Sequence, residues 1–145
     1  ITWSNVGSPN ILEMGFEPDL YLVTRAFQTR HGNGPMTNTD IPHNIKDKPY
    51  ETNVMKKYQK EFKRSLLDLD LLKYAMGKDD YIRESSNKQL VITCMDLVKD
   101  EWRYTIGGEI ISHDNATSFV RGIANYLGIH RVHTISSPDG RLSEN

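Results

Sequence analysis

The sequence predicts an α/β fold in which a mixed, largely buried sheet is flanked by helices. Runs rich in β-forming residues lie between turn-rich segments at residues 20–27, 89–95 and 130–135. Residues 56–76 carry apolar side chains at the three- and four-residue spacing of an amphipathic helix. Strands alternating with helices are typical of an α/β chain. Because 145 residues correspond to about one domain, we expect residues 1–145 to form a single unit.

The first third of the chain predicts one strand between two irregular segments. Residues 1–19 are expected to form a loop with short turns, because glycine and proline interrupt any regular element at Gly7, Pro9, Gly15 and Pro18. Residues 20–27 have the length and composition of a buried strand. After Gly32 and Gly34, the polar stretch that continues to Asn53 predicts a long loop, and loops of that length are usually functional or mobile.

The middle of the chain predicts a long amphipathic helix over residues 56–76. Its expected apolar face consists of Phe62, Leu66, Leu69, Leu72 and Ala75, widened by Leu67 and Leu71. Gly77 is a plausible C-terminal cap for this helix.

The last third predicts two further buried strands, a bent strand and a helix. Residues 89–95 indicate a strand that is followed at Asp96 by a loop. Residues 101–111 indicate a strand with a turn or bulge near Gly107 and Gly108. A helix over residues 116–127 is expected between a cap at Asp114 or Asn115 and a stop at Gly128. A final strand, residues 130–135, precedes the turn residues that begin at Ser136.

Composition excludes several classes of function. Lys and Arg total 18 against 19 Asp and Glu, so no basic excess indicates a nucleic-acid partner. Apolar runs are far shorter than the about 20 residues that cross a bilayer, so we expect a soluble protein without a membrane partner. The single cysteine, Cys94, and the lack of a signal peptide favour a cytoplasmic location. His31, His130 and His133 form no recognised zinc pattern. Because the chain begins with Ile1, we expect it to be part of a longer polypeptide.

The densest group of chemically useful residues is the heptapeptide T-R-H-G-N-G-P, residues 29–35. It follows a predicted strand, and ligands of open α/β sheets collect beyond the carboxyl ends of strands. Glycine allows a ligand to approach the backbone, and Arg30 with exposed amides suits phosphate or ribose oxygens. The alternative is a tight turn in which Arg30 forms a surface salt bridge. The sequence contains neither G-x-x-x-x-G-K-[ST] nor G-x-G-x-x-G, so it shows no triphosphate loop.

Two more candidate loops follow predicted strands. The first, T-C-M-D, residues 93–96, ends in Asp96, whose carboxylate can accept hydrogen bonds from the ring N–H and the exocyclic amine of guanine. A helix cap or turn residue is the alternative for Asp96. The second, S-S-P-D, residues 136–139, can flank a flat base with a proline and small hydroxyls, and its alternative is a plain turn. Three such loops after three strand ends make one shared site credible.

A basic cluster lies at the expected start of the long helix: Lys56, Lys57, Lys60, Lys63 and Arg64. It can face an acidic substrate, although basic residues at a helix start oppose the helix dipole. A solvated helix face is therefore the alternative. A nucleophilic role for Cys94 is disfavoured, because burial in an apolar strand raises the pKa of a thiol.

Four motifs, in order along nearly the whole chain, resemble the C-terminal portion of adenylosuccinate synthetase, the GTP-dependent ligase that joins aspartate to IMP. Residues 1–5, I-T-W-S-N, resemble the family's V-T-S-S-N segment. Residues 22–35 resemble its K-A-Y-x-T-R-V-G-x-G-P stretch, which is the most specific of the four. Residues 93–96 stand where the family has T-K-L-D, and residues 128–141 resemble its G-V-P-x-x-x-I-S-x-G-P-D-R segment.

The resemblance implies a role for each matched residue. Thr2 is expected to hold the 5′-phosphate of the purine nucleotide, and Arg30, His31 and Gly32 to lie by its ribose. Asp96 is expected to bind the base of the nucleoside triphosphate, in a pocket completed by Thr93, Ser136, Ser137 and Pro138. The family's arginine-rich, aspartate-binding segment has Lys63 and Arg64 as its only plausible counterparts, because Glu61 or Phe62 stands where arginine is expected.

The resemblance also implies substrates and partners. These are IMP and GTP with L-aspartate and Mg²⁺, or dGMP and ATP, since His31 and Cys94 depart from the family pattern as in phage-type relatives that act on dGMP. The family's phosphate loop, catalytic base and metal ligands belong to an N-terminal half that this sequence does not contain, so we expect no catalytic residue here and no turnover by the chain alone. The family is dimeric, which makes a homodimer an expectation. A non-catalytic nucleotide-binding or protein-interaction module derived from the enzyme is the alternative.

Overall fold

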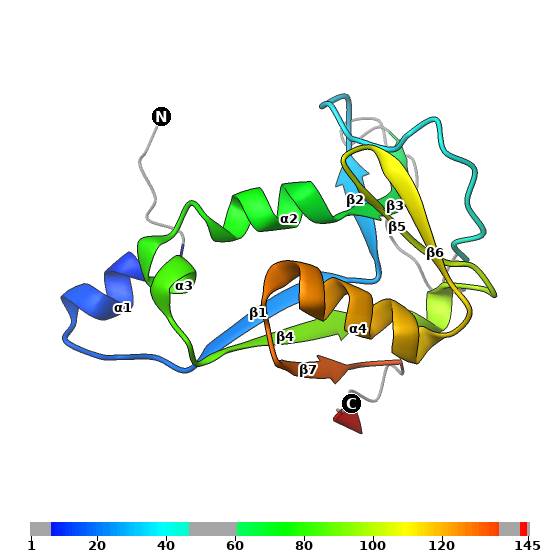
Figure 1. Ribbon diagram of the computed structural model, residues 1–145. Helices are drawn as coiled ribbons and strands as arrows, with labels where there is room; N and C mark the ends of the chain where they lie inside the picture. Colours follow the sequence, from blue (N-terminus) through cyan, green and yellow to red (C-terminus); the bar gives the residue numbers. More distant parts are fainter. Residues whose placement is uncertain (1–6, 47–60, 137–142, 145) are drawn as a thin grey trace.

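The computed structural model describes residues 7–46, 61–136 and 143–144, and it confirms the α/β class (Figure 1). Two four-stranded sheets are present among these residues. The elements, in chain order, are α1 (Pro9–Glu13), β1 (Leu20–Arg25), β2 (Phe27–His31), β3 (Phe62–Asp68), α2 (Leu69–Met76), α3 (Asp80–Glu84), β4 (Lys88–Thr93), the 3₁₀ helix η1 (Met95–Leu97), β5 (Trp102–Ile106), β6 (Glu109–His113), α4 (Ala116–Leu127), β7 (Arg131–Thr134) and β8 (Ser143–Glu144). Over the described ranges, the helices are too short or too polar to span a bilayer.

The first sheet has the strand order β1-β4-β7-β8. β4 lies between β1 and β7 and is parallel to both, while β8 is antiparallel to β7. A central parallel strand is covered on both faces, and β4 accordingly has four consecutive buried residues from Gln89 to Ile92. The carboxyl ends of β1, β4 and β7 therefore lie at one edge of this sheet.

The second sheet has the strand order β2-β3-β5-β6. β2 and β3 form an antiparallel ladder over the full length of β2, and β5 and β6 form a hairpin. β3 pairs in parallel with β5 only at its end, through Leu67 and Asp68. The first half of β3 therefore has a strand neighbour on one side only among the described residues.

The core lies between the two sheets and the helices α2 and α4, which Figure 1 shows above the β1-β4-β7 surface. Phe119 and Ile123 of α4, Leu69 of α2 and Ile92 of β4 are all 0% exposed. Burying each such side chain contributes about 1.5–3 kcal/mol. The helix α4 begins and ends as the sequence predicts, because Asn115 accepts a hydrogen bond from Ser118 N and Gly128 adopts a left-handed conformation.

The predicted strand over residues 20–27 is two strands in two sheets. β1 ends at Arg25, and Ala26 N donates to Thr93 O at 2.9 Å, at the end of β4. From Phe27 the chain continues as β2 and pairs with β3 instead of β4. No glycine or proline marks this change of sheet in the sequence. Ala26, where the change occurs, is 2% exposed and packs in the core. The single predicted sheet is therefore divided into two.

The predicted helix over residues 56–76 is wrong in its described first part. Residues 62–68 form β3, and only residues 69–76 form the helix α2. Asp68 ends the strand and caps the helix, since its carboxylate accepts a hydrogen bond from Leu71 N at 3.1 Å. The leucine spacing fits both a helix and a short buried strand followed by a helix, so periodicity alone does not separate them. Residues 56–60 lie outside the described residues.

Two short helices were not predicted: α1 replaces part of the loop expected over residues 1–19, and α3 lies in a stretch for which no element was predicted. α1 begins at Pro9, a residue that fits the first turn of a helix. α3 is capped by Asp79, whose carboxylate accepts hydrogen bonds from Ile82 N at 3.1 Å and from Ser8 N at 2.8 Å. The cap thus also ties the start of the described chain to α3. In contrast, the predicted turn at Gly107 and Gly108 is confirmed as the β5–β6 hairpin turn.

Candidate functional site

Two of the three candidate loops meet at the carboxyl edge of the first sheet. Asp96 lies in η1, directly after β4, and Ser136 lies two residues after β7. Met95 N donates to Ile135 O at 3.3 Å, and Ile135 N donates to Ile92 O at 2.9 Å. These two hydrogen bonds hold the β4 loop against the β7 loop. The arrangement matches the usual position of ligands in open α/β sheets, beyond the carboxyl ends of the strands.

The β4 loop turns sharply at Cys94, which has a φ of 60° in the left-handed region. A residue with a Cβ rarely adopts this conformation, and such backbone strain is often found at binding sites. The turn presents Asp96 as an exposed residue, whereas Met95 and Leu97 on either side of it are buried. The hydroxyl of Thr93 donates to Thr24 O at 3.2 Å, so it joins β4 to β1.

The third candidate loop lies elsewhere, at the far end of the second sheet. β2 leaves the β4 loop at Ala26, and His31 follows five residues later, roughly 16 Å away at about 3.3 Å per residue. Arg30, His31 and Gly32 therefore lie too far from the β4 loop to contact it directly, and they do not share one pocket with it. They lie instead beside Lys63, because the β2–β3 register places Arg30 opposite Lys63.

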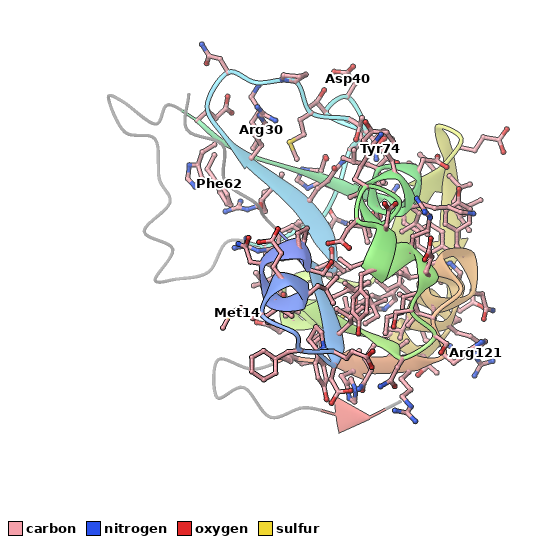
Figure 2. All side chains as sticks on the ribbon, turned by 90° about the vertical axis from the view of Figure 1, so that its left-hand side faces the viewer. Met14, Arg30, Asp40, Phe62, Tyr74 and Arg121 are labelled. Atoms are coloured by element: carbon pink, nitrogen blue, oxygen red, sulfur yellow. The ribbon has the colours of Figure 1, made fainter. Side chains whose placement is uncertain are left out.

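The β2–β3 ladder brings together residues that the sequence analysis assigned to two different ligands. Figure 2 shows Arg30 and Phe62 at the same end of this ladder. The Phe62 ring lies 4.7 Å from the His31 ring and 4.9 Å from the Arg64 guanidinium carbon. The candidate ribose contacts and the candidate aspartate contacts are therefore neighbours.

Lys63 and Arg64 lie on a strand and not on the predicted helix. Consecutive residues of a strand leave it on opposite faces, so Lys63 shares a face with Arg30, whereas Arg64 shares one with Phe62. Both line a polar pocket of about 410 Å³ at the open edge of β3, together with Thr39, His43 and Glu61. Sequence reasoning missed Thr39 and His43, because the long loop that carries them has no regular pattern.

His43 fixes this loop to the open edge of β3. Its Nε2 lies 3.1 Å from Arg64 O, and its Nδ1 accepts a hydrogen bond from Ile45 N at 3.4 Å. Both ring nitrogens of His43 are thus engaged with backbone groups, one on β3 and one on the loop. His43 thereby gives the carbonyl of Arg64 the hydrogen-bond partner that a neighbouring strand provides elsewhere in the sheet.

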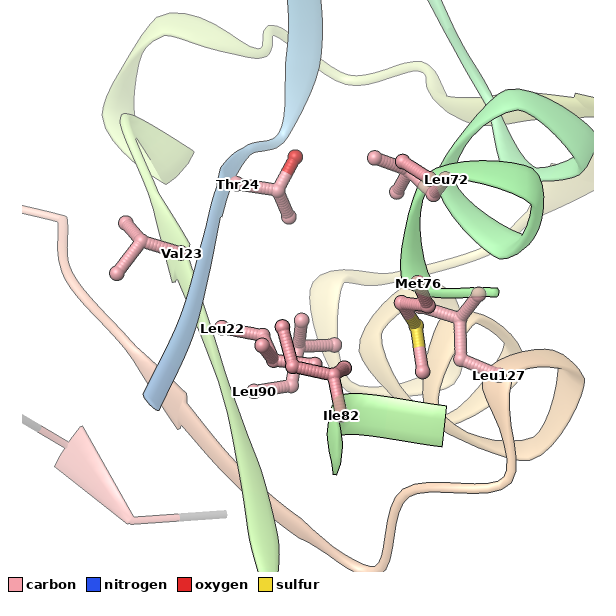
Figure 3. Close-up of a pocket in the computed structure, with 9 residues that line it drawn as sticks. Leu22, Val23, Thr24, Leu72, Met76, Ile82, Leu90 and Leu127 are labelled. Carbon is pink, nitrogen blue, oxygen red and sulfur yellow. The ribbon is translucent and has the colours of Figure 1, made fainter. Parts of the chain in front are cut away.

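Two further cavities lie away from these loops. An apolar cavity of about 220 Å³ lies between β1 and the helices α2 and α3, where Leu22, Leu72 and Met76 project toward one another (Figure 3). A polar cavity of about 470 Å³ lies at the opposite edge of the first sheet and includes Lys88 and Arg131. Lys88 Nζ donates to the carbonyls of Ile82 and Arg83, so part of its hydrogen-bonding capacity is used within the fold.

Three of the candidate residues, Thr2, Ser137 and Pro138, lie outside the described residues. Within residues 7–46, 61–136 and 143–144, no three His, Cys, Asp or Glu side chains are placed to hold a metal ion. The chain matches no model of a protein family and no curated protein. The fold, the paired β4 and β7 loops and the polar end of the β2–β3 ladder define an α/β protein with polar loops at the ends of its strands.

Proposed function

We propose that this chain is the C-terminal portion of an adenylosuccinate synthetase-like ligase of purine nucleotide biosynthesis, which joins L-aspartate to IMP or dGMP with hydrolysis of GTP or ATP. In this proposal the chain contributes contacts to the base, the ribose and aspartate, acts in the cytoplasm and forms a homodimer. Support comes from four motifs in family order and from the positions of the loops that carry two of them.

The observation that carries the proposal is the hydrogen bond from Met95 N to Ile135 O. A shared base pocket requires the loops after β4 and β7 to be adjacent, and this hydrogen bond meets that requirement. The bond holds the exposed carboxylate of Asp96 and the small side chain of Ser136 on neighbouring loops. A carboxylate at this edge can accept two parallel hydrogen bonds from the ring N–H and the exocyclic amine of guanine. Adenine presents an acceptor at the ring position, so the same carboxylate disfavours it.

The β2–β3 ladder would serve the second nucleotide and aspartate. Arg30 and Lys63 offer positive charge on one face of the ladder, and Arg64 offers it on the other. GTP or ATP with Mg²⁺ would supply the phosphoryl group that activates the purine oxygen. The groups that catalyse this transfer belong, in the proposal, to an N-terminal half of the enzyme, so the chain alone is expected to bind nucleotides without turnover.

The test is nucleotide binding by the chain and by its Asp96→Ala variant, measured by calorimetry with GTP, ATP and IMP. The proposal expects a triphosphate to bind the unaltered chain and to bind the variant at least tenfold more weakly, while IMP affinity is unchanged. Asp100→Asn, which removes the charge of an exposed carboxylate four residues further on and keeps a residue that tolerates its left-handed φ of 51°, is the control. If none of the three nucleotides binds before or after the change, the proposed pocket is wrong and a role in protein interaction gains support. Aspartate-dependent ligation by the chain alone would contradict its expected inactivity.

A further inference from the structure

The β2–β3 ladder contains two cations that face each other. Arg30 and Lys63 are directly opposite in the antiparallel register, so both side chains leave the same face. The Cβ atoms of such a pair are about 4.5–5.5 Å apart, and like charges at this separation destabilise the ladder. An anion bound between the two side chains would relieve this repulsion.

The described part of the chain does not supply that anion. Ion pairs in residues 7–46 and 61–136 join Arg83 to Asp80 and Glu84, and Arg103 to Glu101. The side chains of Arg30 and Lys63 have no hydrogen-bonding or ionic partner among these residues. A carboxylate is available nearby on Glu61, but no ion pair joins it to either cation within the described ranges.

The two cations differ in how they are held. A Cβ on Gly34 would come within 1.6 Å of the Arg30 Nη2, so the guanidinium lies directly over the glycine turn that follows β2. The missing side chain at Gly34 therefore leaves room for the guanidinium at this turn. Lys63 lines the polar pocket of about 410 Å³ and shares it with the hydroxyl of Thr39. A guanidinium, an ammonium and an adjacent polar cavity are together able to hold an oxyanion.

We propose that Arg30 and Lys63 together bind one oxyanion, a phosphate or carboxylate group of a substrate, on the face of the ladder that the two side chains share. The inference rests on the proposed function and sharpens it, because it assigns to one anion two residues that the resemblance divides between the ribose and aspartate. The bound anion accepts hydrogen bonds from both cations and removes their mutual repulsion. In the absence of the anion, the pair opposes folding.

The test uses the whole chain and its Arg30→Gln and Lys63→Gln variants, titrated with inorganic phosphate, IMP, dGMP and L-aspartate. Binding is followed by amide NMR shifts and by the rise in Tm. Arg121→Gln and Lys99→Gln remove exposed cations elsewhere, and Figure 2 shows Arg121 on the opposite side of the molecule from Arg30. Arg30→Lys, which keeps the charge, tests whether charge at this position is sufficient for binding.

The proposal predicts that at least one of these four ligands binds the unaltered chain, with shifts in residues 29–34 and 61–64. Each glutamine variant is expected to bind it at least tenfold more weakly, whereas Arg30→Lys and both controls stay within threefold. Without ligand, each glutamine variant is expected to have a Tm equal to or above that of the unaltered chain, because the repulsion is gone. Binding of phosphate and the monophosphates indicates a substrate phosphate, and binding of aspartate alone indicates a carboxylate.

Four results would overturn the proposal. These are no binding of any of the four ligands, unchanged binding in either glutamine variant, equal weakening in the two controls, and a lower Tm of both ligand-free glutamine variants. The outcome is separable from that of the proposed function. Phosphate binding through both cations without triphosphate binding at Asp96 supports the anion pair and contradicts the ligase proposal. Triphosphate binding that needs Asp96, together with failure of the paired-cation test, supports the ligase proposal and contradicts the anion pair.

Discussion

Asp70 on α2 joins two other parts of the molecule through its two carboxylate oxygens. Oδ1 accepts a hydrogen bond from the Tyr126 hydroxyl of α4 at 2.5 Å, and Oδ2 accepts one from Gly107 N in the β5–β6 turn at 2.5 Å. The bond from Tyr126, followed by that from Gly107, lowers the pKa of Asp70 below its ordinary value of 3.8. The same contact with Asp70 raises the pKa of Tyr126.

Asp70→Asn is expected to lower the Tm at pH 7, because the amide offers only one acceptor to two donors. The pKa of Asp70 is lower in the folded state, so its stabilising effect is complete above about pH 4 and is lost as the pH falls through the folded-state pKa. The difference in Tm between the two proteins should therefore shrink between pH 7 and pH 3, as measured by circular dichroism. Asp40→Asn, at an exposed loop carboxylate, should leave the Tm unchanged at both values. An equal Tm difference at pH 7 and pH 3 would show that ionisation of Asp70 is irrelevant.

Single residues were predictable where their partners are close in sequence. Asn115 and Gly128 are identifiable as the ends of α4 because a cap bonds to an amide only three residues away. Asp70 and Tyr126 are 56 residues apart, so no local pattern links them. The Arg30–Lys63 pair escapes sequence reasoning for the same cause, since its register depends on a ladder between segments that the sequence predicts as a loop and a helix.

At the level of elements, the junction of β3 and α2 shows why periodicity misled. Ser65, Leu66 and Leu67 are all buried, although alternate residues of a strand point to opposite faces. Burial of three consecutive residues means that both faces of this end of β3 are covered, so its apolar run does not alternate. Followed by the leucines of α2, that run reproduces the three- and four-residue spacing of one long helix. Asp68 is the local signal that divides the two elements.

The helix α4 packs closely against the second sheet at Gly122. A Cβ at this position would lie 2.3 Å from the Tyr104 hydroxyl and 2.9 Å from His113 Cε1. Tyr104 is 3% exposed and belongs to an aromatic cluster with Phe119 and His113, so its ring has little room to move. The absence of a side chain at Gly122 therefore sets how close the helix lies to β5 and β6.

Gly122→Ala is expected to lower the free energy of unfolding by about 1 kcal/mol, although alanine is the better helix former. Overpacking costs about 1–3 kcal/mol, which exceeds the gain in helix propensity of up to about 1 kcal/mol. Gly77→Ala is the matched control, because Gly77 has a φ of −72° and its nearest Cβ contact is 3.5 Å. Urea denaturation measures both variants. A stabilised Gly122→Ala protein would mean that the helix and the sheet are not in close contact there.

For the whole molecule, the sequence predicted the class of fold but not its division into two sheets. β1, β4 and β7 have strand-like compositions, and their adjacency follows from a simple parallel α/β arrangement. The change of sheet at Ala26 depends on pairing with residues 62–66, about 40 positions along the chain, which no local pattern indicates. The β4 and β7 loops were therefore predictable as neighbours, whereas the separate position of Arg30 was not.

The central claim is that Asp96, held beside the β7 loop, binds the base of a purine nucleoside triphosphate. The most direct measurement compares the affinities of GTP and ITP, which differ only by the exocyclic amine, for the unaltered chain and for Asp96→Asn. We predict that GTP binds the unaltered chain at least tenfold more tightly than ITP, and that this ratio falls close to one in the variant, because a single carboxylate accepts from that amine. Equal affinities for GTP and ITP in the unaltered chain, or a ratio that Asp96→Asn leaves unchanged, would contradict the claim.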